Sequence, residues 1–314
     1  MKAELAQEII ACLPTDRTLF WYYKDYYAVY LLHRELSQHG ARTVSKLRKG
    51  RFGRLLRKPI FTELLAKSGS GKLCASDIEN RWSQDYEPYV LTLSTWGNEH
   101  AKRYRYYQVS RPGKNLVLQM NFCSRHDALY RQYIHNDMDY FKCLDHPVSR
   151  DYCTLAWARI DLDLTTGEAL IEEIQNDWLR DMDYLARYVK RCALRGHASV
   201  RLGNWTLDLA KALIYLESEI ARHKVIWSEA MLSAAIKFLH EEIGIKRIYY
   251  HSPDTGAAMK NIRYSKPPRS IYKTLPKQFC FESVNEAPSF IARDKQAKRR
   301  IKTMKNQQWF CMAA

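Results

Sequence analysis

Residues 155–178, LAWARIDLDLTTGEALIEEIQNDW, decide the fold of this chain. Apolar and polar residues alternate on both sides of Thr166-Gly167, which is typical of two antiparallel strands joined by a tight turn. The first strand then has one apolar face, with Ala158, Ile160 and Leu162. Its other face carries Trp157, Arg159, Asp161 and Asp163. The pattern therefore predicts a hairpin with one markedly polar face.

Residues that oppose each other across a hairpin lie on the same side of the sheet. The predicted register places Arg159 opposite Glu173, Trp157 opposite Gln175, and Asp161 opposite Ile171. Arg159, Glu173 and Gln175 should then form one polar cluster, which Asp177 extends as the strand ends. Polar groups on a central strand must be paired or face a cleft. The cluster is thus either a structural ion pair or part of a functional cleft, and catalysis requires that it reach a solvent-accessible pocket.

His251 follows a strand expected at 245–250. Functional groups of α/β folds lie at the carboxyl ends of strands, and a histidine can act there as acid, base or ligand. The structural alternative is a histidine that caps the turn HSPDTG at 251–256. The candidate catalytic residues are Glu173, Gln175, Asp177, Arg159, Asp161 and His251.

Outward from the hairpin, the pattern predicts helices at 178–194, 206–222 and 226–243 and strand character at the end of 271–281. Toward the N-terminus it predicts an amphipathic helix at 15–39 and a hairpin of 104–110 with 115–122. The fold class is therefore α/β (α+β), with a mixed sheet flanked by helices in the C-terminal half and helical and β elements in the N-terminal half. We expect a basic α+β region at 1–150, an α/β domain at 151–290 and a basic tail at 291–314.

The segment ALIEEIQNDW at 169–178, with Arg159 before it, resembles the EIQSDW signature of uncharacterised domains in large polyvalent proteins of phages and mobile elements. The resemblance covers about residues 155–281 and is specific at Glu172-Glu173-Ile174-Gln175 and Asp177-Trp178. It implies no known reaction.

The element order also resembles the second half of a GCN5-related N-acetyltransferase (GNAT), with a hairpin, a long helix, a strand ending in a polar turn, and a Tyr-x-x-Leu element at Tyr272 and Leu275. The resemblance implies a GNAT-like fold and an acetyl-CoA-dependent transferase. Such enzymes hold the CoA pyrophosphate in a Gly-rich loop that opens the long helix, where backbone N–H groups meet phosphate. Residues 225–228, VIWS, contain no glycine at that place, so the sequence does not establish acetyl-CoA as the cofactor.

A different enzyme class fits the same hairpin. Asp161 or Asp163, followed by Glu173-x-Gln175, matches a relaxed form of the D…(D/E)-x-K nuclease core. Its carboxylates would hold Mg²⁺ and activate water for attack on a phosphodiester. Many hairpins satisfy so short a pattern, and neither acetyl-CoA nor Mg²⁺ is established as a cofactor.

A net charge of +16 favours an anionic partner, and we expect nucleic acid or another polyanion. Two runs, residues 42–58 and 293–305, hold eight and seven of the 50 Lys and Arg residues and a single acid between them. A run without any acid is unusual for a merely solvated loop. The candidate nucleic-acid-binding residues are Arg48, Lys49, Arg51, Arg54, Arg57, Lys58, Arg299 and Arg300.

Other classes are excluded by composition. No apolar stretch is long enough for a transmembrane helix, and the first residues do not resemble a signal peptide, so we expect no membrane partner. Eight scattered cysteines predict reduced thiols in a cytoplasmic protein. His126 with Asp127, and His135 with Asp137, match no standard ligand spacing, so no metal site is predicted.

Three functional hypotheses follow from these patterns. The first is a transferase-like protein acting on or near nucleic acid through the polar cluster. The second is a Mg²⁺-dependent nuclease that uses the hairpin carboxylates. The third is a non-catalytic nucleic-acid-binding or phage-associated accessory protein, in which the polar cluster is structural.

Overall fold

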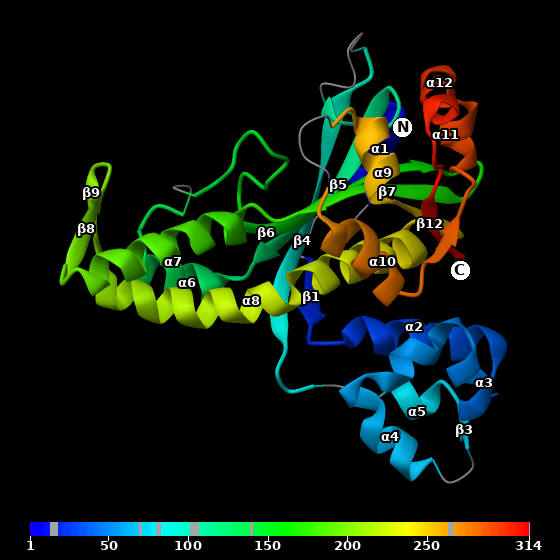
Figure 1. Cartoon of the computed structure of the whole chain (residues 1–314), viewed down its shortest axis with the longest axis horizontal. Helices are drawn as coiled ribbons and strands as arrows, with labels where there is room; N and C mark the ends of the chain where they lie inside the picture. The colour runs from blue at the N-terminus through cyan, green and yellow to red at the C-terminus, as the bar shows by residue number, and fades with distance from the viewer. Residues whose placement is uncertain are drawn as a thin grey trace.

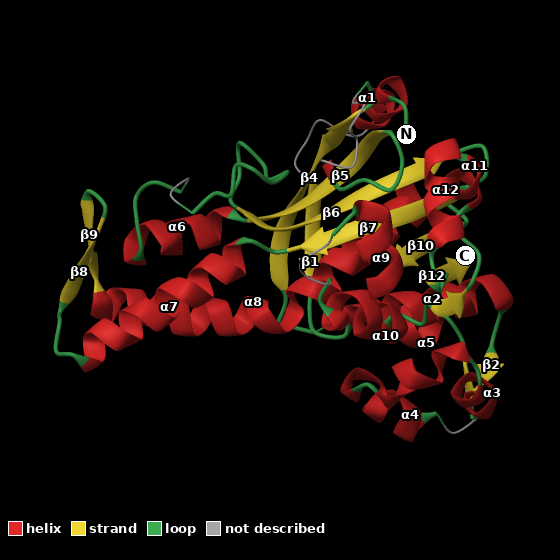
Figure 2. Ribbon diagram, turned by 45° about the horizontal axis from the view of Figure 1, so that its top comes forward, coloured by secondary structure: helices red, strands yellow, loops and turns green. Residues whose placement is uncertain are grey.

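The computed structural model describes residues 1–12, 18–68, 71–79, 83–100, 107–138, 141–262 and 267–313. Within these residues the chain builds an eight-stranded sheet and two separate two-stranded ribbons (Figure 1). Helices flank the large sheet and extend beyond one of its sides (Figure 2). The fold is mixed α/β, as the sequence predicts.

The large sheet has the strand order β1-β4-β5-β6-β7-β10-β12-β11. β7 and β10 pair in parallel, whereas the other neighbouring strands of this sheet pair antiparallel. The strands are β1 (Thr18–Tyr22), β4 (Glu87–Asn98), β5 (Gly113–Phe122), β6 (Thr154–Asp163), β7 (Glu168–Gln175), β10 (Arg247–His251), β12 (Trp309–Ala313) and β11 (Glu282–Val284).

This sheet crosses both of the region boundaries that the sequence suggested. β5 pairs with β6 across residue 150, and β12 lies between β10 and β11 although it belongs to the expected tail. One cluster of buried hydrophobic side chains extends from Met1 to Met312. The hydrophobic core is therefore shared between the three regions.

The β6/β7 hairpin confirms most of the predicted register. Arg159 lies opposite Glu173, and Trp157 lies opposite Gln175. The turn between the strands contains Gly167, whose positive φ of 64° suits a residue without a Cβ atom. The hairpin therefore carries the polar face that the sequence predicts.

A β-bulge then interrupts this hairpin. Ile160 lies opposite Ile171, which leaves Glu172 as the extra residue of β7. Asp161 consequently lies opposite Leu170, and the prediction that it faces Ile171 is wrong. The bulge changes which side chains β7 presents to the elements packed on it.

A helical arm extends from the sheet, with α6 (Ser124–Tyr133), α7 (Trp178–Leu194) and α8 (Leu209–Lys237) side by side (Figures 1 and 2). The helix predicted at 178–194 is confirmed. The helices predicted at 206–222 and 226–243 are one helix, α8, which continues into the π-helical turn η4 (Phe238–Glu242). No Gly or Pro lies between 206 and 243, so nothing breaks the helix there. The ribbon of β8 (Ser199–Leu202) and β9 (Trp205–Asp208) lies at the far end of the arm.

The helix predicted at 15–39 is wrong in its first part. Thr18–Tyr22 forms β1, and α2 (Tyr26–His39) begins only after Asp25, which has a left-handed backbone conformation. Along β1, Phe20 and Tyr22 are buried while Leu19 and Trp21 are exposed, which is the alternation of a strand. The dense aromatic run conceals that alternation from a search for helical periodicity.

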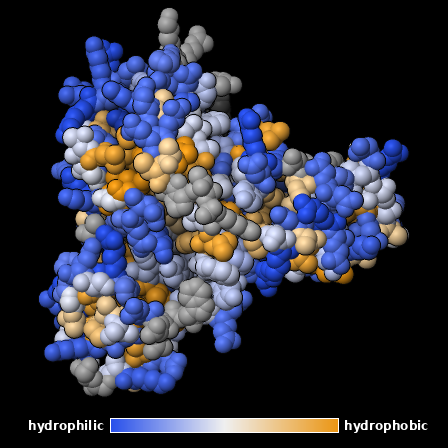
Figure 3. All heavy atoms as spheres, turned by 180° about the vertical axis from the view of Figure 1, so that it is seen from behind, coloured by the Kyte–Doolittle hydropathy of each residue, from blue (hydrophilic) through white to orange (hydrophobic). Residues whose placement is uncertain are grey.

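A small lobe follows α2 and carries the first basic run. Its elements are β2 (Arg42–Thr43), α3 (Val44–Lys49), η1 (Arg51–Arg57), η2 (Pro59–Phe61), α4 (Thr62–Lys67), β3 (Lys72–Leu73) and α5 (Ser76–Glu79). The apolar side chains of Leu47, Phe52, Leu55 and Leu56 are buried, which anchors the short helices. The surface seen from behind is mostly hydrophilic over this lobe and over the arm (Figure 3).

The second predicted hairpin is also corrected. β5 pairs with β4 rather than with 104–110. Residues 107–110 form no strand, and 104–106 lie outside the described residues. The turn signal at 111–114 instead overlaps the start of β5, which begins at Gly113.

The remaining helices pack around the C-terminal strands. They are α1 (Ala3–Cys12), α9 (Pro253–Lys260), η5 (Ser270–Thr274), α10 (Leu275–Gln278), α11 (Ser289–Arg293) and α12 (Lys295–Thr303). The turn expected at 251–256 is in fact the start of α9, where Ser252 and Thr255 form a capping box. Among the described helices, none combines the length and apolar composition needed to cross a bilayer.

Candidate functional site

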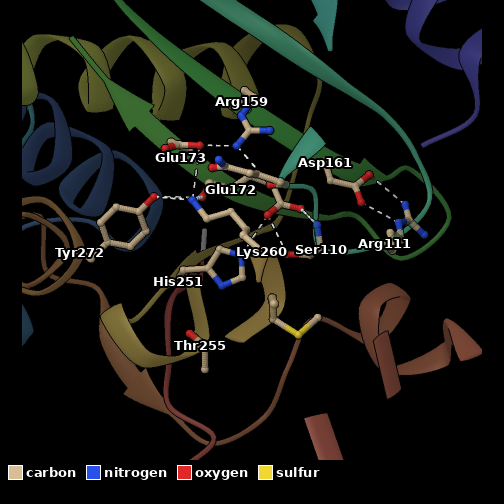
Figure 4. Close-up of polar contacts among 12 residues, drawn as sticks. Ser110, Arg111, Arg159, Asp161, Glu172, Glu173, His251, Thr255, Lys260 and Tyr272 are labelled. Carbon is tan, nitrogen blue, oxygen red and sulfur yellow. Dashed lines mark hydrogen bonds and ion pairs between the residues drawn. The ribbon is translucent and has the colours of Figure 1, made fainter. Parts of the chain in front are cut away.

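The β6/β7 hairpin and α9 bring three charged side chains together inside the protein (Figure 4). Arg159 of β6 donates a hydrogen bond to Glu173 of β7. Lys260, at the end of α9, has its Nζ atom 3.4 Å from the same carboxylate oxygen. Arg159 and Lys260 are 2% and 1% exposed, and the side chain of Glu173 is 14% exposed. We call these three residues the ion cluster.

The charges of the ion cluster stabilise one another. Burial alone would raise the pKa of Glu173, but the positive charges of Lys260 and Arg159 lower it from 4.5 to about 2. Burial lowers the pKa of Lys260, an effect that the charge of Glu173 opposes. Glu173 is thus ionised at neutral pH and compensates two neighbouring cationic groups.

Most of the remaining donors of the ion cluster are also paired, and Arg159 Nε is the exception among them, because no described group accepts from it. Arg159 donates to the backbone carbonyls of Tyr107 and Gln108, at 2.8 and 3.2 Å. Lys260 donates to the Tyr272 hydroxyl at 2.7 Å and to a backbone carbonyl of β7 at 3.2 Å. A charged group satisfied in this way is held in place and has little freedom to meet a substrate.

The bulge residue Glu172 forms a second buried group with Ser110 and His251. The Ser110 hydroxyl donates to Glu172 Oε2 at 2.7 Å, and His251 Nε2 lies 3.0 Å from that oxygen and 3.0 Å from Ser110 Oγ. In a nucleophilic triad, one ring nitrogen faces the serine and the other faces the carboxylate. Here Nε2 faces both, and all three side chains are sealed from solvent. The arrangement is a hydrogen-bonded core group.

Asp161 belongs to a third group. Its oxygens accept hydrogen bonds from the Met1 amine at 2.7 Å and from Arg111 Nε and Nη2 at 2.6 and 2.9 Å. Burial would raise the pKa of Asp161, but the two cations hold it below its ordinary value. Because Asp161 is paired here and Glu173 is paired in the ion cluster, a Mg²⁺ ion would have to displace cations from both carboxylates.

The last two residues of the predicted cluster lie in another environment. Asp177 Oδ1 accepts from Gln175 Nε2 at 2.6 Å and from Arg180 at 2.9 Å. Asp177 Oδ2 lies 2.7 Å from His146 Nδ1 and accepts from Trp157 Nε1 at 3.1 Å. The hydrogen bond to Asp177 raises the pKa of His146. Asp177 therefore fixes the ring of a partly exposed histidine.

A cysteine completes this second environment. Potential donor atoms of Cys143, His146 and Asp177 all lie within 4.8 Å of one another. Cys143 and His146 are partly exposed, whereas Asp177 is buried. Burial, and after it the charge of Asp177, raises the pKa of the Cys143 thiol. We call these three residues the Cys-His-Asp cluster.

The predicted polar cluster thus divides in two. Arg159 and Glu173 lie in the buried ion cluster, whereas Gln175 and Asp177 support His146 near the surface. Asp161 and His251 are buried in separate groups. A cavity of about 360 Å³ borders Arg111 and Asp163, and its lining includes none of Arg159, Asp161, Glu173 and His251. A catalytic role for the four buried residues stays a prediction without geometric support.

Sequence reasoning misses several residues that complete these groups. Lys260 lies far from the hairpin in sequence, and nothing in its local pattern marks it. Tyr272 is marked only as part of the Tyr-x-x-Leu element, which does not indicate its hydrogen bond to Lys260. Ser110 stands next to a turn signal that the pattern assigns to another hairpin. Cys143 and His146 do leave a signal, because Cys-x-x-His is a spacing that suits metal ligands.

The predicted nucleic-acid-binding residues lie on two surfaces. In the N-terminal lobe, Arg48, Lys49 and Arg57 are exposed and form no ion pair with a described residue. Three others are engaged: Arg51 with Glu35, Lys58 with Asp25, and Arg54 with the Lys277 carbonyl. On α12, Arg299 is exposed, whereas Arg300 is partly buried and donates to the Met259 carbonyl.

No protein-family model, curated protein or solved structure matches this chain. Proposals about its function therefore rest on the geometry of the described residues.

Proposed function

We propose that this protein binds nucleic acid through basic surfaces on α12 and on the α3–η1 segment, and that its buried ion cluster is structural. The observation that carries the proposal is the distribution of side chains on α12. Ala297 and Ile301 are buried one helical turn apart. The exposed residues of the same helix include Lys295, Lys298, Arg299 and Lys302.

These four side chains recur at the spacing of successive turns, so they form one basic face of the helix. No described acidic residue forms an ion pair with any of them. The helix spans nine residues, from Lys295 to Thr303, and a helix of this kind fits the width of a DNA major groove. Unpaired cations on an ordered helix can replace the counterions of a phosphate backbone at little entropic cost.

The α3–η1 segment supplies a second surface of the same chemistry. Lys46, Arg48, Lys49 and Arg57 are exposed around the buried side chain of Leu47 and its neighbours. Thr43 caps α3 by accepting a hydrogen bond from the Lys46 backbone amide at 3.2 Å. These bases are thus presented by folded elements rather than by a loose loop.

The test is a salt-dependent binding measurement with a labelled DNA duplex and a single-stranded RNA of matched length. Replacing Lys295, Lys298, Arg299 and Lys302 by Gln should weaken binding. It should also reduce the slope of log K against log[salt] by about 0.9 for each phosphate that the protein no longer neutralises. The matched control replaces Lys67, Lys190, Lys224 and Lys237 by Gln, which removes the same charge. Each of those lysines is already paired with an acid.

Binding that is unaffected by the α12 changes, or equally weakened by the control, would contradict the proposed α12 surface. A wild-type protein that shows no salt-dependent binding to either polynucleotide would contradict the proposed function itself.

A transferase is the second candidate, supported by one observation. The parallel pair β7/β10 is joined through α7 and α8, in the order that the acetyltransferase resemblance implies. Residues 225–228, however, lie inside α8 rather than at the start of a helix, so their backbone N–H groups are not free to meet a phosphate. Thermal stabilisation by acetyl-CoA would favour the transferase, and its absence at millimolar ligand would count against it.

A further inference from the structure

We propose that Cys143, His146 and Asp177 form a zinc-binding site at the junction of β7 and α7. The proposal is independent of nucleic-acid binding. It rests on the proximity of three different side chains that zinc prefers, a thiolate, an imidazole and a carboxylate.

The geometry suits a single ion. Potential ligand atoms of the three residues lie within 4.8 Å of one another, and tetrahedral zinc bonds of about 2.0–2.3 Å place ligand atoms about 3.3–3.8 Å apart, so the side chains need only a small shift to hold one ion. Cys143 and His146 come from one Cys-x-x-His segment, and Asp177 comes from the end of the hairpin. His146 Nδ1 and Asp177 Oδ2 lie 2.7 Å apart, and a metal bound between them would take the place of this contact.

Neighbouring side chains hold the carboxylate in position. Trp157 Nε1 donates to Asp177 Oδ2 at 3.1 Å, and Arg180 donates to Oδ1 at 2.9 Å. Such supporting hydrogen bonds orient metal ligands in zinc proteins. Gln175 also donates to Asp177, so two residues of the signature-like segment serve this site.

The site is accessible to an ion from solvent. The side chain of His146 is 33% exposed, and Cys143 is partly exposed beside the exposed residues Leu144 and Asp145. Three protein ligands leave the fourth tetrahedral position for water, which is the ligand number of catalytic rather than structural zinc. The ion would therefore be able to polarise a ligand that replaces this water.

The first experiment titrates metal-free full-length protein with Co²⁺ and then with Zn²⁺. We expect one equivalent of Co²⁺ to bind with sulfur-to-cobalt charge-transfer absorption, which one equivalent of Zn²⁺ abolishes. Cys143→Ser should remove this absorption and weaken zinc binding by more than the roughly 10- to 100-fold loss typical of a supporting residue. The control is Cys74→Ser, because Cys74 is also partly exposed and contacts a carboxylate, that of Asp77, at 3.0 Å.

A second readout uses the wild-type chain and does not depend on the folding of a variant. Zn²⁺ should slow alkylation of Cys143 and leave that of Cys74 unchanged, as measured by peptide mass spectrometry. Charge-transfer absorption that persists in Cys143→Ser, or wild-type protein in which Zn²⁺ leaves Cys143 unprotected, would overturn the proposal.

Discussion

Replacing Glu173 by Gln tests whether the ion cluster is a closed structural group. The change removes the one carboxylate of the cluster and leaves Arg159 and Lys260 buried without their counter-charge. A drop in the Glu173 pKa from 4.5 to about 2 is equivalent to about 3 kcal/mol of stability at neutral pH. Breaking a buried pair by removing one partner costs a similar amount, about 3–5 kcal/mol. We therefore expect Glu173→Gln to lower the free energy of unfolding by about 3 kcal/mol.

Lys260→Met is the matched comparison. It removes a cation whose burial lowers its own pKa, and it keeps the Arg159–Glu173 pair intact. The methionine side chain fills much of the same volume, and the variant cannot form the hydrogen bonds to the Tyr272 hydroxyl and to the β7 backbone carbonyl. We expect a loss of about 2 kcal/mol, since the usual net value is about 1 kcal/mol for each hydrogen bond. Equilibrium urea unfolding, followed by circular dichroism, measures both variants.

The pH dependence gives the sign of the effect. The folded-state pKa of Glu173 is depressed, so its contribution is fully present above pH 4.5 and is lost as the pH falls through about 2. The stability difference between wild type and Glu173→Gln should shrink over the same interval. If Glu173→Gln is as stable as wild type, or less damaging than Lys260→Met, the cluster is not a closed ion group. That result would again favour the hypothesis that the polar cluster is part of a functional cleft.

Three further predictions concern other parts of the fold. A Cβ atom at Gly53 would lie 2.1 Å from the Arg48 carbonyl oxygen, so Gly53→Ala should lower the free energy of unfolding in urea by about 2 kcal/mol. The control is Gly50→Ala, which should cost less than about 1 kcal/mol because its nearest contact is at 3.5 Å. Equal losses would refute this close approach. Asp208→Ala removes the N-cap of α8 and should cost about 1 kcal/mol in the same assay, and an unchanged midpoint would exclude the cap. Burial lowers the pKa of His126 from 6.5 to about 4, so its ring should stay neutral down to that pH in an NMR titration; protonation near pH 6.5 would place it in solvent.

The sequence predicts the centre of the sheet better than its edges. The hairpin at 155–178 has a clear two-residue period and a glycine turn, and its outer register is confirmed. The bulge at Glu172 shifts the alternation by one residue, so that Ile171 and Ile174, three positions apart, both belong to the core, and a register with a regular two-residue period misses this shift. Its consequence for Asp161 therefore emerges only from the structure.

Contacts between residues far apart in the sequence also escape prediction. Lys260 meets Glu173 because α9 packs beside β7, and no local pattern encodes that contact. The aromatic run before α2 resembles a helix in sequence because its strand is only five residues long. Short elements give periodicity too few residues to distinguish a helix from a strand.

The segment at 169–178, which resembles the EIQSDW signature, contributes side chains to two different environments. Glu173 points into the ion cluster, whereas Gln175 and Asp177, two and four residues further on, hold His146 close to Cys143. One short stretch thus fixes the core of the hairpin and places a candidate zinc site beside it. The basic surfaces on α12 and the α3–η1 segment contain none of these residues. Loss of polynucleotide binding with retained zinc, or the reverse, would therefore show that the two properties are separable, as their separate positions in the fold require.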